Sequence, residues 1–225
     1  MTNTLNLNLN ALLDFYDDRV PESVGHASAI NAVLGEDLAI GLVTDYFRRR
    51  GSEARLVSRT CTQGTQKGVR LDAWLEVSST EGVFYYQAEI KNWSAHAIGG
   101  RVAPKDQSET EMHAYRINRW LNQCDPKLRT LKQAKAQKVL TPMKPEESDW
   151  VVRPLIIFWD SMHPAGENIP LFDVEISNSD FDRLWVFSMS SYVRSLLTNK
   201  IAQVEILMPE FSSRLHWLHQ LVRPL

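Results

Sequence analysis

Residues 69–77, Val-Arg-Leu-Asp-Ala-Trp-Leu-Glu-Val, and residues 83–93, Val-Phe-Tyr-Tyr-Gln-Ala-Glu-Ile-Lys-Asn-Trp, form the stretch around which the chain is organised. The polar, glycine-containing segment between them predicts the loop of an antiparallel hairpin. Glu89 and Lys91 are two residues apart, so on a strand they share a face. Hairpin pairing can then bring Asp72 beside Glu89.

The segments on either side of this hairpin alternate between helical and strand patterns. A helix is expected over residues 28–50, because its apolar positions repeat at helical spacing and Gly51 follows its end. A strand is expected over residues 54–62. Further helix is expected between residues 107 and 140. The nearly continuous apolar run at residues 151–159 is typical of a strand covered on both faces.

One α/β domain over residues 1–225 is the economical interpretation. Its core would span about residues 28–160, and residues 161–225 would form a C-terminal α/β extension. That extension shows strand-like and helical patterns of its own.

Composition excludes several classes of protein. Hydrophobic residues make up 44% of the chain and charged residues 23%, which is ordinary for a globular protein. No apolar stretch approaches membrane-spanning length, and the N-terminus lacks the features of a secretory signal. Two cysteines form no paired motif. A cytoplasmic location without membrane contact is therefore expected.

The net charge of −2 conceals a strong segregation of charge along the chain. Residues 48–70 and 101–144 each carry a net charge of +6, and residues 71–100 between them carry −3. If the two basic blocks converge in space, they form a basic rim round an acidic centre, which suits a polyanion held over a bound metal. A solvated charged surface is the alternative for either block.

Glu36 is a third candidate carboxylate. It begins a row that continues with Ile40, Val43 and Phe47 at spacings of four, seven and eleven residues, which place all four on one helical face. A carboxylate in line with an apolar stripe is expected to point inward. The adjacent Asp37 is the other acidic residue that could do so.

The order of helix, strand, strand with Asp72, strand with Glu-x-Lys, helix and strand resembles the PD-(D/E)XK nuclease superfamily, over about the first 160 residues. Asp72 takes the place of the motif's first aspartate, Glu89-Ile90-Lys91 that of (D/E)XK, and Glu36 that of a helical glutamate found in many members. Leu71 stands where the motif has proline, and no Gln-x-x-x-Tyr helix follows the lysine.

The resemblance implies a restriction-endonuclease-like fold, a mixed β-sheet core flanked by helices. It also implies that Mg²⁺ or Mn²⁺ is held by Asp72, Glu89, Glu36 and the backbone carbonyl of Ile90. Mg²⁺ prefers such oxygen ligands, and a metal lowers the pKa of bound water. Lys91 would orient or deprotonate that water, or stabilise the transition state.

The expected function is metal-dependent phosphodiester hydrolysis, on DNA in preference to RNA, in prokaryotic restriction or phage defence. Lys67, Arg70 and Arg101 border the expected site and are candidate phosphate contacts. A protein partner from a defence system and a homodimer are both compatible with this interpretation. The alternative is a catalytically inactive nucleic-acid-binding or protein-binding module on the same fold.

Overall fold

The computed structural model describes residues 4–17, 24–60, 70–91, 139–140, 151–161, 163, 165, 167–176, 180–208, 210, 211, 213, 214, 216 and 220. For residues 17, 24–33, 58–60 and 70 it describes the backbone alone. The elements in chain order are β1 (Thr4–Asn8), α1 (Leu9–Asp17), α2 (Val24–Arg49), β2 (Glu53–Thr60), β3 (Arg70–Ser79), β4 (Gly82–Lys91), β5 (Val151–Phe158), β6 (Leu171–Glu175), β7 (Arg183–Ser188), α4 (Met189–Thr198) and β8 (Gln203–Leu207). Within these ranges, none of the helices combines the length and apolar character needed to cross a membrane.

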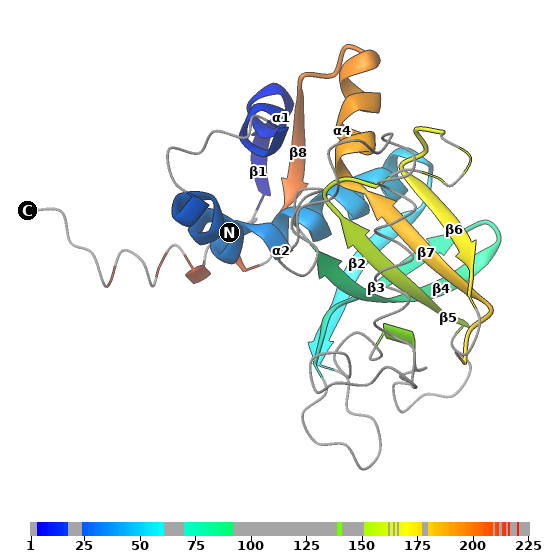
Figure 1. Cartoon of the computed structure of the whole chain (residues 1–225). Coiled ribbons are helices and arrows are strands. Elements are labelled where there is room, and N and C mark those ends of the chain that lie inside the picture. Colours follow the sequence, from blue (N-terminus) through cyan, green and yellow to red (C-terminus); the bar gives the residue numbers. More distant parts are fainter. Residues whose placement is uncertain are drawn as a thin grey trace, which may run out of the picture.

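A six-stranded mixed sheet in the order β2-β3-β4-β5-β7-β6 is the main structural layer (Figure 1). The predicted hairpin is confirmed as β3 and β4, which pair antiparallel through Ala73↔Ala88 to Ser79↔Gly82. The positive φ of Gly82, +129°, is a backbone conformation that glycine adopts without strain. The α/β class is therefore confirmed.

The strand expected at residues 151–159 is present as β5, and it runs parallel to β4. Its register runs from Phe84↔Val151 to Lys91↔Phe158. The helix expected between residues 107 and 140 lies outside the described residues, except that residues 139–140 form a short 3₁₀ turn.

The C-terminal extension supplies two strands to this same sheet. β7 lies parallel to β5, and β6 pairs antiparallel with β7 at the edge. β5 is therefore a central strand, although it contains Pro154, which lacks a backbone N–H. Its ladder with β7 begins one residue later, at Leu155↔Trp185, so the proline precedes that ladder.

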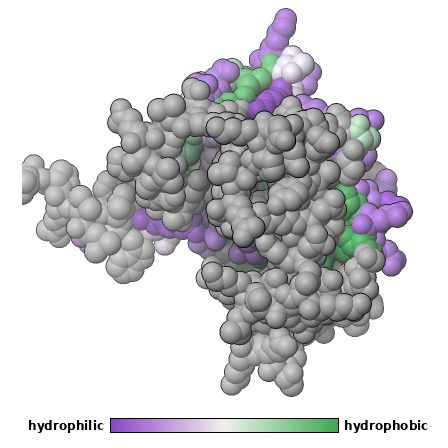
Figure 2. Space-filling view, viewed as in Figure 1, coloured by the Kyte–Doolittle hydropathy of each residue, from purple (hydrophilic) through white to green (hydrophobic). Residues whose placement is uncertain are grey.

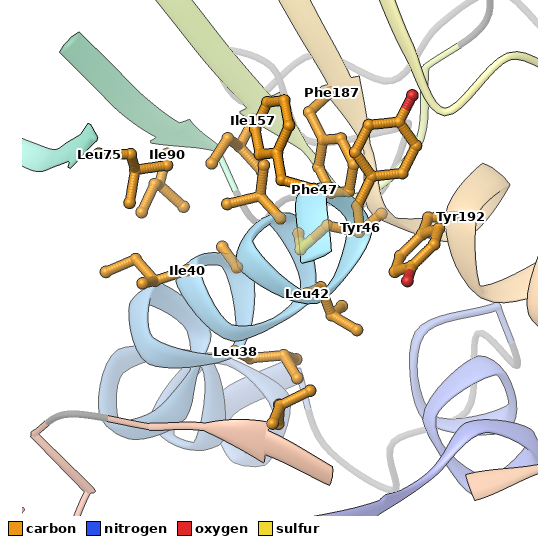
Figure 3. Packing of buried hydrophobic residues seen from close by; sticks show 14 of the residues in the cluster. Leu38, Ile40, Leu42, Tyr46, Phe47, Leu75, Ile90, Ile157, Phe187 and Tyr192 are labelled. Atoms are coloured by element: carbon orange, nitrogen blue, oxygen red, sulfur yellow. The ribbon is translucent and has the colours of Figure 1, made fainter. Parts of the chain in front are cut away.

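Helix α2 lies between the large sheet and a smaller sheet of β1 and β8 (Figure 1). Residues 37–44 are consequently all buried. Figure 3 shows its apolar side chains meeting the sheet on one side, where Phe47 lies near Ile157 and Phe187. The helix ends at Arg49, and Gly51 follows with φ of +80°, as expected of a residue just past a helix end.

The surface seen in Figure 2 is mainly hydrophilic where its residues are described, with small hydrophobic groups between. Three described large hydrophobic residues are exposed, namely Val57, Val83 and Val151. Phe84 pairs with Val151 in the register, so Val83 and Val151 lie near one another at one end of β4 and β5. Scattered exposure of this kind is normal for a folded domain.

Candidate active site on the β3–β4 hairpin

The two faces of the hairpin have different surroundings. Ala73, Leu75 and Val77 of β3 join the apolar core beneath α2, together with alternate residues of β4. Because side chains alternate along a strand, Glu89 and Lys91 belong to the opposite face of β4. β3 is irregular between Arg70 and Trp74, where Leu71 packs with Trp74 and Tyr85, so simple alternation does not place Asp72 on that face.

Asp72 is joined directly to the Glu-x-Lys segment. The last regular pair of the hairpin is Ala73↔Ala88, and the next positions in that register are Asp72 and Glu89. There the Asp72 carboxylate continues the pairing, because its Oδ2 accepts a hydrogen bond from the backbone N–H of Ile90 at 2.8 Å. The carboxylate is thus held against the residue between Glu89 and Lys91.

Glu89 and Lys91 form an ion pair on this face, between Oε1 and Nζ. Their side chains are 11% and 23% exposed, respectively, so the pair is largely withdrawn from solvent. Burial of a charged pair costs desolvation energy that the attraction between the charges only partly offsets. An exposed strand with a solvated ion pair, which is the simplest structural explanation for a Glu-x-Lys motif, is therefore not what the structure contains.

The site lies at the end of the sheet where the strands β4, β5 and β7 reach their carboxyl ends. These three strands are parallel to one another, and Lys91, Phe158 and Ser188 are aligned across their ends. In open α/β sheets, ligands bind outside the carboxyl ends of the parallel strands. The backbone carbonyl of Lys91 accepts a hydrogen bond from the Trp159 N–H at 3.3 Å, which fixes the strand end.

A second polar cluster at the same end of the sheet was not anticipated from the sequence. Asp160 Oδ1 accepts a hydrogen bond from Ser190 Oγ at 2.8 Å and lies 3.9 Å from Arg194 Nη1. The available signal was an acidic residue placed immediately after a buried apolar run. The contacts themselves depend on α4 folding back against the end of β5, which no local pattern shows.

Glu36 does not point inward, contrary to the expectation from its row. Its side chain is 42% exposed, and its Oε2 lies 3.6 Å from Arg214 Nη2. The buried carboxylate of α2 is the neighbouring Asp37, which is fully buried and accepts the backbone N–H of Glu210 at 3.0 Å. The prediction was wrong because α2 is covered on two sides, so a single apolar row does not identify its buried face.

Few side chains in the described parts of the chain are placed to serve as metal ligands. Within the described parts of the chain, no group of three or more His, Cys, Asp or Glu side chains is placed to hold a metal ion together. Asp72 and Glu89 remain as a pair of carboxylates, with the Ile90 carbonyl as a further oxygen. Mg²⁺ is commonly held by one or two carboxylates, several waters and substrate phosphate.

The expected nucleic-acid contacts fall largely outside the described residues. Lys67 and Arg101 both lie there, and Arg70 is described only as the backbone start of β3. Most of the second basic block, residues 101–144, also lies outside the described residues.

Comparison with protein-family models, with curated proteins and with solved structures found no match to this chain.

Proposed function

We propose that the chain is a metal-dependent nuclease that hydrolyses phosphodiester bonds, with DNA as the preferred substrate. The observation that supports this most directly is the hydrogen bond from the Ile90 N–H to Asp72 Oδ2, beside the Glu89–Lys91 ion pair. It brings an aspartate next to the segment that carries a glutamate and a lysine, at the carboxyl ends of parallel strands, where ligands commonly bind. The resemblance to the PD-(D/E)XK superfamily supports the same chemistry, and restriction or phage defence as its setting.

Each side chain would have a distinct role. Asp72 and Glu89 would hold Mg²⁺ or Mn²⁺ through carboxylate oxygens. The cation, when bound, would neutralise phosphate charge and acidify a water molecule. Lys91 would orient the attacking water or stabilise the negative charge that develops at phosphorus. Its ion pair with Glu89 keeps the ammonium group next to the metal ligands before substrate binds.

Cleavage assays on linear, circular, single-stranded and branched DNA, and on RNA, test this proposal. We expect Mg²⁺-dependent products from the parent chain. Asp72→Asn and Lys91→Ala should each reduce the rate by about 100-fold or more, because each removes a group that acts on the reacting phosphate.

Glu76→Gln is the matched control for these variants. Glu76 lies on the same strand as Asp72 but pairs with Arg55, at 2.8 Å between Oε2 and Nη2. Its loss should leave cleavage unchanged. If the parent cleaves none of the substrates with Mg²⁺ or Mn²⁺, the nuclease proposal fails. Retained binding to DNA in that case would instead identify an inactive nucleic-acid-binding module.

A further inference from the structure

Gln87 is a fully buried polar side chain on the same face of β4 as the candidate site. It precedes Glu89 by two residues and lies opposite Trp74 in the hairpin register. The next position towards this end of the sheet is that of Asp72 and Glu89. The roles proposed above for the carboxylates and the lysine leave this buried amide without a function.

The Gln87 amide contacts a segment that is distant in sequence. Its Nε2 donates a hydrogen bond to the backbone carbonyl of Val139, which lies 52 residues further along the chain. Val139 and Leu140 are themselves buried, with 0% and 8% exposure. This bond therefore ties the 3₁₀ turn at residues 139–140 to the strand that carries Glu89 and Lys91.

The turn at residues 139–140 covers the strand beside the site. Val139 and Leu140 pack in one apolar cluster with Ile156 and Phe158 of β5. Ile156 is the register partner of Glu89, and Phe158 is the partner of Lys91. The turn thus forms a lateral wall, and Gln87 joins that wall to β4.

We propose that Gln87 is a positioning residue of the candidate site. Its hydrogen bond to Val139 holds the wall against β4 and β5, and the wall limits the water and the rotamers available to Glu89 and Lys91. This inference rests on the proposed nuclease function, because it assigns Gln87 to the same metal site. Groups that orient metal ligands from outside the ligand set typically change metal affinity or activity by about 10- to 100-fold when removed.

Gln87→Leu removes the amide while keeping the side chain close to its original volume. It leaves the Val139 carbonyl without its donor, which loosens the turn. We expect the dissociation constant for Mn²⁺, measured by calorimetry, to rise by about 10-fold and kcat to fall by a similar factor. KM for DNA should stay within about twofold, because the phosphate contacts are unchanged. If Gln87→Leu fails to fold, Gln87→Met gives the same readout with a more adaptable side chain.

Thr44→Val is the matched control. Thr44 is a buried polar residue whose Oγ1 donates to the Ile40 carbonyl at 2.8 Å on α2, which packs against the other face of the sheet. Its loss should lower stability without changing Mn²⁺ affinity or kcat of the folded protein. Hydrogen exchange at residues 139–140 should accelerate in Gln87→Leu and stay unchanged in Thr44→Val.

Two results separate this inference from the function on which it rests. If the parent binds Mn²⁺ and cleaves DNA but Gln87→Leu does so with unchanged constants, Gln87 is merely structural and the inference is overturned. If the parent neither binds Mn²⁺ nor cleaves, the nuclease proposal and the positioning role fail together. Accelerated exchange in Gln87→Leu would then show only that the bond anchors the turn.

Discussion

Replacement of Gly41 by alanine should destabilise the protein, although alanine is the better helix former. Gly41 lies within α2 where the helix passes close to β8. An added Cβ would lie 2.9 Å from Ile206 Cδ1 and 3.0 Å from the Leu207 carbonyl oxygen. The Leu207 backbone is held in place by its pairing with Thr4 of β1, so it cannot recede without moving both strands.

The size of the effect follows from two opposing terms. Alanine in place of glycine favours a helix by about 0.8–1.0 kcal/mol. Forcing an extra carbon into a packed interior costs about 1–3 kcal/mol. The balance is a net loss of about 1 kcal/mol in the free energy of unfolding, which corresponds to a decrease in Tm of about 2–4 °C for a chain of this length.

Urea unfolding of a double-mutant cycle tests this reasoning. Ile206→Val removes the Cδ1 atom that an alanine at position 41 would meet, and should by itself cost about 0.5–1.5 kcal/mol. Because the second change relieves the contact created by the first, the combined variant should lose less than the sum of the two single losses, by about 0.5 kcal/mol or more. A stabilised Gly41→Ala protein, or strictly additive losses, would refute the proposed contact.

Two further variants test the electrostatics of the fold. Hydrogen bonds from Arg55 lower the pKa of Glu76, so the stability from this pair is present above the carboxylate's ordinary pKa and is lost as pH falls through the lowered value. Glu76→Gln should therefore be less stable than the parent in urea titrations at pH 7, and this difference should shrink as the pH is lowered through the acid range. Burial, followed by the 2.7 Å hydrogen bond to Asp45, raises the pKa of Tyr192, so its contribution is complete below the ordinary phenol pKa of about 10 and declines above it. Tyr192→Phe should be less stable than the parent by about 1–2 kcal/mol at pH 7. When the pH is raised from 8 to 10.5, the Tm of Tyr192→Phe should fall less than the Tm of the parent, because phenylalanine has no hydroxyl group to ionise.

The hairpin, and the position of Glu89 and Lys91 on one face of its second strand, could be predicted from the sequence because these signals are local. Pairing of the two strands likewise predicts that Asp72 lies near the Glu-x-Lys segment, and the contact is made with the Ile90 backbone. Strand β5 could likewise be expected from its continuous apolar run, which is typical of a strand covered on both faces. These features depend on residues that are close together in sequence or on a strand's own composition.

Features that depend on distant contacts could not be predicted in this way. β1 carries only a short alternation of leucine with asparagine, and its strand pairing depends on β8. Glu36 and Asp37 are adjacent on α2, and only the position of β8 and the segment after it determines which carboxylate is buried. The contact between Gln87 and Val139 joins segments 52 residues apart, for which neither segment contains a signal.

The pairing of β1 with β8 can form only after nearly the whole chain has been synthesised. Asn6 Nδ2 donates a hydrogen bond to Gln203 Oε1 across this sheet, and the two residues are 197 residues apart. At about 5–20 residues per second, the ribosome needs about 10–40 s to make β8 after β1 has been made. Tyr16 of α1, which follows β1 directly, stacks on Trp159 at 4.0 Å between ring centroids. The edge of the candidate site therefore reaches its final surroundings only late in translation, and a nascent chain would carry the two carboxylates and the lysine before this flank of the site is complete.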